Sequence, residues 1–400
     1  MRFAETINGI GVNRINKEDY MMKRAAIFVA LGLLMVSMAS AISAAEPYKI
    51  GAVFAITGPA AWLGEPERNT VKMIEEQINA QGGINGHPLE IIVEDTVGEE
   101  AKAVMAVQKL INRDNVLAIV GPTRSGTTMA VIPIVEKAQV PLVSCAAAEA
   151  IVNPVRKWVF KTPQKDSDAA IRIYEKMKEM NISKVAIITS TEGFGMEGRK
   201  QLTQLSPKMG ITIVADETYG PKDTDMTAQL TKIKGTDAQA IVNWSIVPGQ
   251  ATIIKNKKQL GMTMPLFQSH GFGNIKYAKA AGDAANGVLF PAGRLLVVDS
   301  LPDSHPQKAL LAQYKKDYET KFKTDASTFG GHAYDALNLV IAALKAVGPD
   351  RAKIRDYIEN TKNFVGTGGV FNYSPEDHTG LTKDAFEMIT VQDGKFLPAK

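Results

Sequence analysis

The sequence predicts an α/β protein with two lobes, each built on a doubly wound parallel sheet that helices cover on both faces. Three observations lead to this prediction. Short runs rich in Ile and Val are almost continuously apolar, as strands buried on both faces must be. Amphipathic helical stretches separate these runs. The alternation begins near residue 48, stops near residues 158–168 and resumes near residue 185, which indicates two such units.

The first unit alternates strand and helix from its start. Val71, Ile74 and Ile78 recur at helical spacing, and Gly82 and Gly83 follow where that helix should end, because glycine accepts a left-handed C-cap. The expected strands are residues 48–54, 88–94, 117–121 and 141–145, and the expected helices are 67–80, 99–113 and 129–138.

The second unit repeats the pattern. Its expected strands are residues 185–189, 211–215, 240–244 and 265–267, and its expected helices are 198–208, 226–234 and 249–260. Residues 160–163 and 287–298 are the expected crossings between the units. Two further helices, 306–322 and 332–347, and a hairpin-like tail at 370–396 complete the chain.

The N-terminal region has the pattern of a secretory signal peptide. A basic pair, Lys23 and Arg24, precedes an apolar run at 25–38 and small residues at 39–45. Because a membrane span takes about 20 apolar residues, a membrane anchor is the less favoured alternative. We expect a signal peptide at 21–45, cleaved after Ala44 or Ala45. Residues 1–20 are expected to be a mis-called start or an extension.

Composition narrows the function further. The chain has 46 Lys and Arg against 42 Asp and Glu, so it lacks the basic surplus that nucleic-acid binding requires. Cys145 is the single cysteine, which excludes an internal disulfide and lies too far from the leader to carry a lipid anchor. The 355 residues that follow the leader suit two domains. We therefore expect a soluble periplasmic protein.

Two loops invite an enzymatic interpretation that their details do not favour. Residues 193–198 read G-x-G-x-x-G, but three residues separate them from the strand and the periplasm lacks a nicotinamide pool, so we expect no cofactor. The five histidines are not spaced as metal ligands, and we expect no metal. Ser125 has no identifiable base in the sequence, so nucleophilic catalysis is not favoured.

The loop at residues 121–128 is better suited to holding an anion. It lies between a strand and a helix, and it supplies hydroxyls, Arg124 and backbone N–H groups at a helix N-terminus. Ser125 or Thr127 could also serve simply as the helix N-cap. His270 directly follows the strand 265–267, where open α/β sheets bind ligands, although an ordinary loop histidine is an equal alternative.

These loops belong to an ordered series of motifs that resembles the periplasmic binding proteins of branched-chain amino acid ABC transporters, a type I bilobed family. The resemblance covers residues 47–400 and includes a helix that ends in Asn-Ala-Gln-Gly-Gly-Ile-Asn-Gly. The matching segments are 50–53, 57–59, 78–86 with Asp95, 119–122, 159–162, 192–195 and 330–336.

The resemblance implies two lobes joined by three crossing segments, with the ligand enclosed between them. By position, one lobe would comprise residues 47–163 and 294–366, and the other 164–293 and 367–400. The ligand-binding residues it implies are Trp62, Leu63, Arg124, Ser125, Cys145, Ala146, Ala147, Phe194, Trp244, His270 and Gly271.

Two positions depart from the amino-acid binders that the chain resembles. Those proteins usually carry an acidic residue at the position of His270 and a threonine at that of Ala147, and both can contact the ligand's ammonium. Here both are missing, and Arg124 adds a positive charge. Burying an ammonium without a counter-charge is unfavourable by several kcal/mol.

We therefore expect a carboxylate ligand without an α-amino group, either aromatic or aliphatic, with Trp62, Phe194 and Trp244 around it. An ordinary hydrophobic or branched-chain amino acid, with Glu149, Glu192 or backbone carbonyls accepting the ammonium, stays an open alternative.

The expected function is that of a monomeric solute-binding protein that delivers its ligand to an inner-membrane ABC permease, and not that of an enzyme. A ligand-sensing receptor module is the alternative, and a periplasmic α/β enzyme is a less favoured one.

Overall fold

The computed structural model describes residues 21–22 and 45–399. Residues Pro47–Lys400 form one compact unit, separate from Met1–Glu46. The predicted signal peptide and its cleavage site lie almost entirely outside the described residues. Within the part of the chain that the structure describes, no helix combines the length and the apolar character needed to cross a bilayer.

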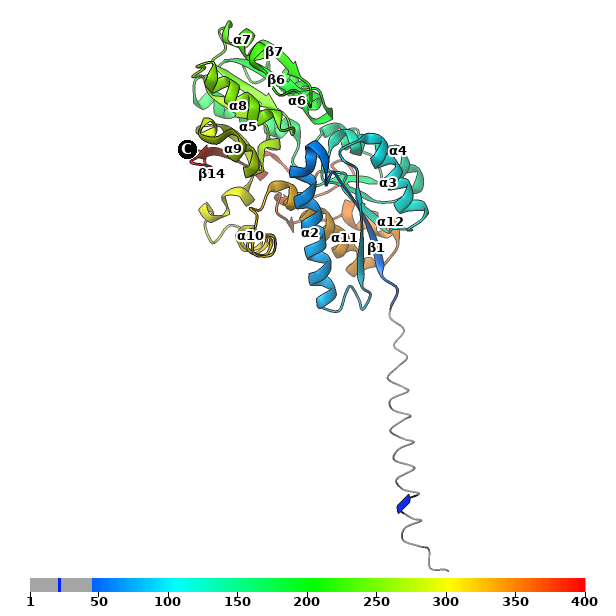
Figure 1. The fold of residues 1–400 in the computed structure, drawn as a ribbon. Helices are drawn as coiled ribbons and strands as arrows, with labels where there is room; N and C mark the ends of the chain where they lie inside the picture. The colour runs from blue at the N-terminus through cyan, green and yellow to red at the C-terminus, as the bar shows by residue number, and fades with distance from the viewer. Residues whose placement is uncertain (1–20, 23–44, 400) are drawn as a thin grey trace, which may run out of the picture. The chain divides into compact units, whose positions relative to one another are not determined.

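A five-stranded, wholly parallel sheet forms the first half of the fold (Figure 1). Its strand order is β2-β1-β3-β4-β5, so the chain starts inside the sheet and winds outward in both directions. The strands are β1 Tyr48–Phe54, β2 Leu89–Asp95, β3 Ala118–Val120, β4 Leu142–Ser144 and β5 Val159–Lys161, with helices α2 Ala61–Ala80, α3 Glu100–Asn112 and α4 Ser125–Ala138 between them.

A seven-stranded mixed sheet, in the order β14-β13-β10-β9-β8-β6-β7, forms the second half. Its five central and outer strands from β10 to β7 are parallel, and β13 and β14 add an antiparallel edge. The strands are β6 Lys184–Ser190, β7 Thr212–Tyr219, β8 Ala240–Trp244, β9 Leu266–Gln268, β10 Leu289–Gly293, β13 Phe386–Gln392 and β14 Lys395–Pro398. The helices are α5 Asp166–Glu179, α6 Gly193–Leu205, α7 Thr227–Lys234, α8 Gly249–Gln259 and α9 Ile275–Ala281.

The remaining elements connect the two sheets. They are α10 Lys308–Phe322, α11 Thr328–Val347, α12 Arg351–Glu359 and the short hairpin β11 Phe364–Val365 with β12 Val370–Phe371. Helix α11 packs along α2 (Figure 1). Short 3-10 helices occur at η1 Gly58–Ala60, η2 Glu149–Ile151, η3 His270–Phe272, η4 Gly282–Ala285, η5 Arg294–Ser300 and η6 Lys383–Ala385.

Helices cover both faces of the first sheet, as the continuous apolar runs of the sequence predict. Successive side chains of a strand point to opposite faces. Ile50, Ala52 and Phe54 of β1 accordingly belong to one apolar cluster, and Val53 belongs to another. The α/β fold class with two parallel-sheet halves is confirmed.

The segment after the hairpin β11–β12 packs on the first sheet. Phe371, Tyr373, Leu381 and Ala385 belong to the cluster that covers that sheet, and the chain enters the second sheet at Phe386. The lobe boundary at residues 366–367 stays a prediction.

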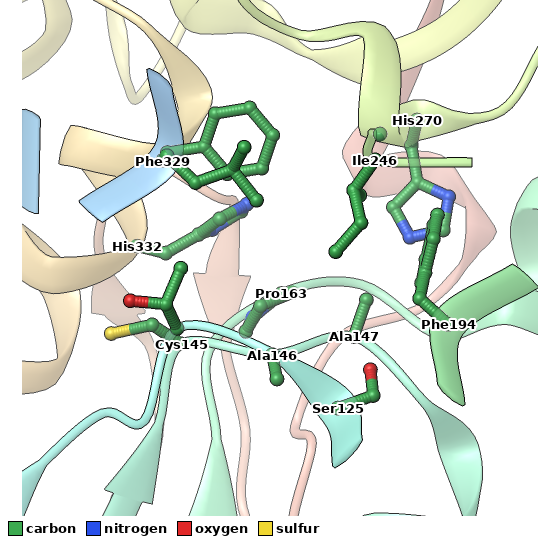
Figure 2. A pocket seen from close by; sticks show the side chains of 13 residues that line it. Ser125, Cys145, Ala146, Ala147, Pro163, Phe194, Ile246, His270, Phe329 and His332 are labelled. Carbon is green, nitrogen blue, oxygen red and sulfur yellow. The ribbon is translucent and has the colours of Figure 1, made fainter. Parts of the chain in front are cut away.

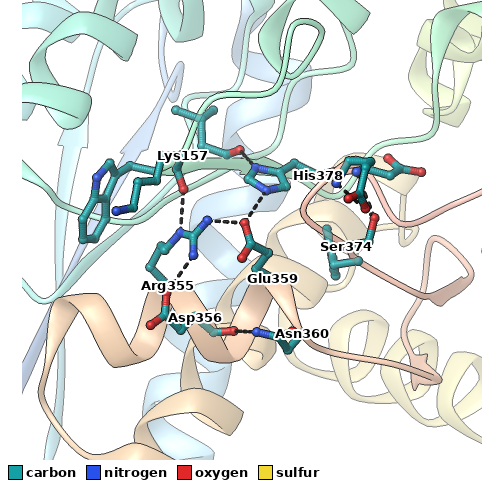
Figure 3. Close-up of polar contacts among 12 residues, drawn as sticks. Lys157, Arg355, Asp356, Glu359, Asn360, Ser374 and His378 are labelled. Atoms are coloured by element: carbon teal, nitrogen blue, oxygen red, sulfur yellow. Dashed lines mark hydrogen bonds and ion pairs between the residues drawn. The ribbon is translucent and has the colours of Figure 1, made fainter.

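A buried histidine ties this last segment to the first sheet (Figure 3). The imidazole of His378 is fully buried and stacks on Phe160, with ring centroids 4.2 Å apart. Its Nδ1 lies 2.8 Å from the carbonyl oxygen of Val159, and its Nε2 lies 3.2 Å from Oε1 of Glu359. Arg355 also donates to Glu359 and to the carbonyl of Lys157, 2.8 Å away. This network joins α12 and the crossing segment to β5.

Replacing His378 with alanine is expected to destabilise the protein by about 2–4 kcal/mol, because its two buried polar contacts, with Val159 O and Glu359 Oε1, are lost and a stacked ring is removed. His305→Ala is the matched control, since His305 is half-buried and its ring makes one hydrogen bond, to Gln307 N. Urea unfolding of both variants measures the difference. Equal losses would contradict this role for His378.

Candidate functional site

A cavity lies where the carboxyl ends of strands from both sheets come together (Figure 2). The loops after β3, β4 and β5 border it from the first sheet, and those after β6, β8 and β9 from the second. The space enclosed is about 330 Å³, part of it open to solvent. Its lining residues are Leu63, Thr123, Ser125, Cys145, Ala146, Ala147, Pro163, Phe194, Ile246, His270, Gly271, Phe329 and His332.

Ser125 is the first residue of α4, so the cavity faces the N-terminal end of that helix. The first N–H groups of a helix have no acceptor within it and carry its positive dipole end. The hydroxyl of Ser125 accepts a hydrogen bond from Ala148 N at 3.3 Å, and the hydroxyl of Ser144 accepts one from Ala146 N at 3.1 Å. The β4 loop is thus held against the start of α4.

A buried lysine supports the same loop from behind. Lys161 is fully buried, and its Nζ donates to the carbonyl of Ala147 at 2.6 Å and to that of Gln164 at 3.0 Å. Burial lowers the pKa of Lys161 to about 8, against the attraction of Asp166. Both hydrogen bonds are made by the ammonium, so this side chain fixes backbone positions and does not itself line the cavity.

The second sheet contributes mainly aromatic and apolar surface. Phe194 lies in the first turn of α6, whose N-cap Glu192 accepts from Phe194 N at 2.9 Å and Gly195 N at 3.0 Å. His270 is the first residue of η3, which follows β9. Figure 2 shows Phe194 and His270 on one side of the cavity and Phe329 and His332 on the opposite side.

No aspartate, glutamate, lysine or arginine is among the lining residues described. Two buried carboxylates contact residues of the lining without bordering the cavity themselves. Glu67 is fully buried and accepts from the hydroxyl of Thr123, and burial raises its pKa well above that of an ordinary carboxyl group. Asp166 lies behind His270. Burial lowers the pKa of His332 to about 3, so this imidazole is neutral at neutral pH.

Eight of the eleven residues expected from the sequence border the cavity. They are Leu63, Ser125, Cys145, Ala146, Ala147, Phe194, His270 and Gly271. Whether they touch a ligand stays a prediction, because the structure contains none.

Three expected residues lie elsewhere. Arg124 donates through Nη1 to the carbonyl of Gly98 at 2.7 Å, and its Nη2 is 3.8 Å from Oε2 of Glu192. Trp244 is fully buried beneath the cavity, where it packs against Phe194 and His270. Trp62 packs edge-on against Tyr277, outside the lining.

The sequence missed Thr123, Pro163, Ile246, Phe329 and His332. Phe329 and His332 were missed because α11 begins at Thr328, one turn earlier than predicted, under the N-cap Ser327. In the sequence, the consecutive glycines Gly330 and Gly331 suggest that a helix does not extend through them. A Cβ on Gly330 would lie 2.4 Å from the Tyr314 hydroxyl oxygen, so this glycine permits close helix packing.

The G-x-G-x-x-G motif also has a packing explanation. A Cβ on Gly195 would lie 2.1 Å from the Ser190 carbonyl oxygen, and one on Gly198 would lie 2.2 Å from the Trp244 ring. A Cβ on Gly193 would lie 3.0 Å from Gly126 N, at the start of α4. Across residues 21–22 and 45–399, no three His, Cys, Asp or Glu side chains are grouped to hold a metal ion.

Comparison with known proteins agrees with this architecture. A family model described as periplasmic binding protein matches residues 47–395. The leucine-, isoleucine-, valine-, threonine- and alanine-binding protein of Pseudomonas aeruginosa is 27% identical over 350 residues, which is 86% of this chain and 90% of that protein.

Two solved structures are similar over nearly the same range. An extracellular ligand-binding receptor from Rhodopseudomonas palustris HaA2 has a TM-score of 0.83 and 26% identity, covering 89% of this chain and 100% of that one. The branched-chain amino acid transporter substrate binding protein LivJ of Streptococcus pneumoniae, solved with isoleucine, has a TM-score of 0.78 and 28% identity, covering 89% and 99%. This chain therefore belongs to the type I periplasmic binding proteins, and it is similar to leucine-, isoleucine- and valine-binding members of that family.

Proposed function

We propose that this protein is a periplasmic solute-binding protein of an ABC importer, and that it captures a small apolar carboxylate that lacks an α-amino group. The observation that carries the ligand class is the lining of the cavity, which joins a helix N-terminus to apolar side chains and includes no acidic side chain. Its relatives are binding proteins, which supports capture and delivery to a permease and not catalysis.

The carboxylate end of the ligand would lie against the start of α4. Ser125 supplies a hydroxyl there, and the helix end favours negative charge through its unpaired N–H groups. The remainder of the ligand would pack among Leu63, Ile246 and Phe329. The lining residues Leu63, Ile246 and Phe329 are apolar, which favours an aliphatic or aromatic acid.

An ammonium group would find no counter-charge in this cavity. Glu192, which could have supplied one, already accepts from Ser190 Oγ at 2.8 Å and from two backbone N–H groups of its own helix. Glu149, the other acidic candidate, does not border the cavity. A buried and unpaired ammonium is unfavourable by several kcal/mol.

Capture would require the two sheets, which we assign to two lobes, to open and close about the crossing segments. Several contacts join residues of the two proposed lobes around the cavity, and three of them lie at the loops that border it. Asn274 Nδ2 donates to the carbonyl of Trp62 at 2.7 Å, Arg124 approaches Glu192, and Gly193 lies against Gly126. These contacts support a closed arrangement that ligand binding would favour.

A branched-chain amino acid is the second candidate, because relatives with 27–28% identity are named as binders or carriers of such ligands. In that case the backbone carbonyls at the cavity, or the ring nitrogens of His270, would have to accept the ammonium hydrogens.

Matched pairs of ligands test the proposed class. In a thermal-shift screen, 4-methylpentanoate and 3-phenylpropanoate are expected to raise the melting temperature more than L-leucine and L-phenylalanine, from which they differ only by the amino group. A ligand at about 100 times its Kd stabilises the folded state by ~2.7 kcal/mol. Strong stabilisation by leucine with none by 4-methylpentanoate would refute the deaminated ligand and favour the second candidate.

Gly193→Ala tests closure. The added Cβ would lie 3.0 Å from Gly126 N and 3.2 Å from Gly126 Cα, so the two helix starts could not approach as closely. Ligand affinity is expected to fall about 5–10-fold, the lower end of the cost of overpacking, while the melting temperature of the ligand-free protein stays the same. Gly235→Ala is the control, because its Cβ would meet nothing closer than 3.4 Å. Equal calorimetric affinities for the two variants would argue against this contact in the bound state.

A further inference from the structure

His332 is a buried imidazole at the cavity wall with an unused ring nitrogen. It is the fifth residue of α11, it borders the cavity, and its residue is 6% exposed. Its Nδ1 has no hydrogen-bond partner among the residues that the structure describes. A buried polar atom without a partner is unfavourable, and a ligand in the adjoining cavity is the group that could supply one.

The backbone that carries this imidazole is firmly held. The carbonyl oxygen of His332 accepts a hydrogen bond from Oγ1 of Thr162, 2.9 Å away, which directly follows β5. At the start of the helix, N and Oγ1 of Thr328 both donate to the carbonyl of Gly273, at 3.2 and 3.3 Å. The ring of Phe329 lies edge-on to the imidazole, with centroids 6.3 Å apart. The side chain therefore occupies a defined place in the wall.

This imidazole is neutral at neutral pH. Burial, together with the nearby His270 and Lys161, lowers the pKa of His332 to about 3. A neutral imidazole has one N–H donor and one nitrogen acceptor, which suits an uncharged group that can both donate and accept, such as a hydroxyl. A second carboxylate would find no charged partner in this side chain, and the ammonium of Lys161 is already held by two backbone carbonyls.

His332 lies across the cavity from the position proposed for the carboxylate. Figure 2 shows Ser125 and His332 on opposite sides of the cavity. Thr123, another polar lining residue, is a poorer partner, because its Oγ1 already accepts from Ala55 N at 3.0 Å and donates to Glu67. A ligand whose carboxylate meets Ser125 would therefore direct its other end toward His332.

We propose that His332 hydrogen-bonds a hydroxyl group at the end of the ligand opposite its carboxylate, so that the protein selects hydroxylated aromatic or aliphatic acids over the same acids without the hydroxyl. This inference rests on the proposed function, because it takes the carboxylate to lie at the start of α4. It adds that the far end of the ligand is polar and uncharged, which the apolar part of the lining alone does not require.

Three pairs of ligands that differ only by a hydroxyl test this specificity. They are 3-(4-hydroxyphenyl)propanoate with 3-phenylpropanoate, 6-hydroxyhexanoate with hexanoate, and L-tyrosine with L-phenylalanine. In calorimetry with the unmodified protein, the hydroxylated member of at least one pair is expected to bind about 5–10-fold more tightly, the size expected for one neutral hydrogen bond. Equal or weaker binding by the hydroxylated member of every pair would overturn the proposal.

His332→Phe assigns the preference to this residue, because it keeps a ring in the wall and removes both nitrogens. The preference for the hydroxyl is expected to disappear or reverse, while the affinity for the acid without it changes little. His305→Phe is the matched control, since His305 does not border the cavity, and it is expected to keep the full preference. A preference that His332→Phe retains would contradict the proposal.

NMR of the unmodified protein decides if His332→Phe does not fold. The ring nitrogen signals of His332 are then expected to shift more with the hydroxylated acid than with its partner, because only the former can form the hydrogen bond. Equal shifts with both members of the pair would overturn the proposal.

The outcomes separate this inference from the proposed function. If tyrosine binds and the deaminated acids do not, the proposed ligand class is wrong, and the tyrosine and phenylalanine pair decides the role of His332. If the deaminated acids bind with no preference for the hydroxyl, the ligand class stands and the role of His332 is wrong. If no hydroxylated acid binds, this inference is overturned, and 4-methylpentanoate against L-leucine still decides the ligand class.

Discussion

The carboxyl ends of strands from two sheets border one cavity, and most of its lining is apolar. A polar ligand group buried against such a wall needs a partner from the protein, because an unpaired buried polar group is unfavourable. The start of α4 offers donors, and the β4 loop is held next to it by Lys161 and by the hydroxyls of Ser125 and Ser144. We therefore expect the site to select its ligand by matching a few polar atoms set in a mainly apolar wall.

Charged side chains are arranged one layer behind this wall. Glu67 stands behind Thr123, Asp166 behind His270 and Lys161 behind the carbonyl of Ala147. None of them lines the cavity, yet each contacts a residue that does. The lining residues described therefore include no aspartate, glutamate, lysine or arginine, and no such charge loses its hydration when a ligand fills the cavity.

The sequence predicted cavity-lining residues best in the loops that directly follow a strand. The rule that ligands bind at the carboxyl ends of parallel strands led to Ser125 and His270, and family resemblance added the β4 loop and Phe194. It was a poor guide where the outcome depends on packing between distant segments. Arg124 contacts Gly98 and Glu192, neither of which is close to it in the sequence, and this contact takes it out of the cavity.

The same limit explains the remaining differences. Helix α11 runs through Gly330 and Gly331, where the Tyr314 hydroxyl and the Thr367 side chain leave no space for a Cβ. No local signal in the sequence reports these neighbours. Before the chain enters the second sheet, His378 and the apolar residues of the same segment pack on the first sheet, while the local sequence of that segment only suggests a hairpin.

The reactivity of the chain's single thiol can report how accessible the cavity is to a reagent. Cys145 lines the cavity yet is only 3% exposed, and burial, reinforced by the nearby Glu67, raises its pKa well above that of a free thiol. An alkylating reagent needs both access to the sulfur and its thiolate form. In the proposed closed arrangement Cys145 is shielded, so we expect its alkylation to become faster when the proposed lobes open.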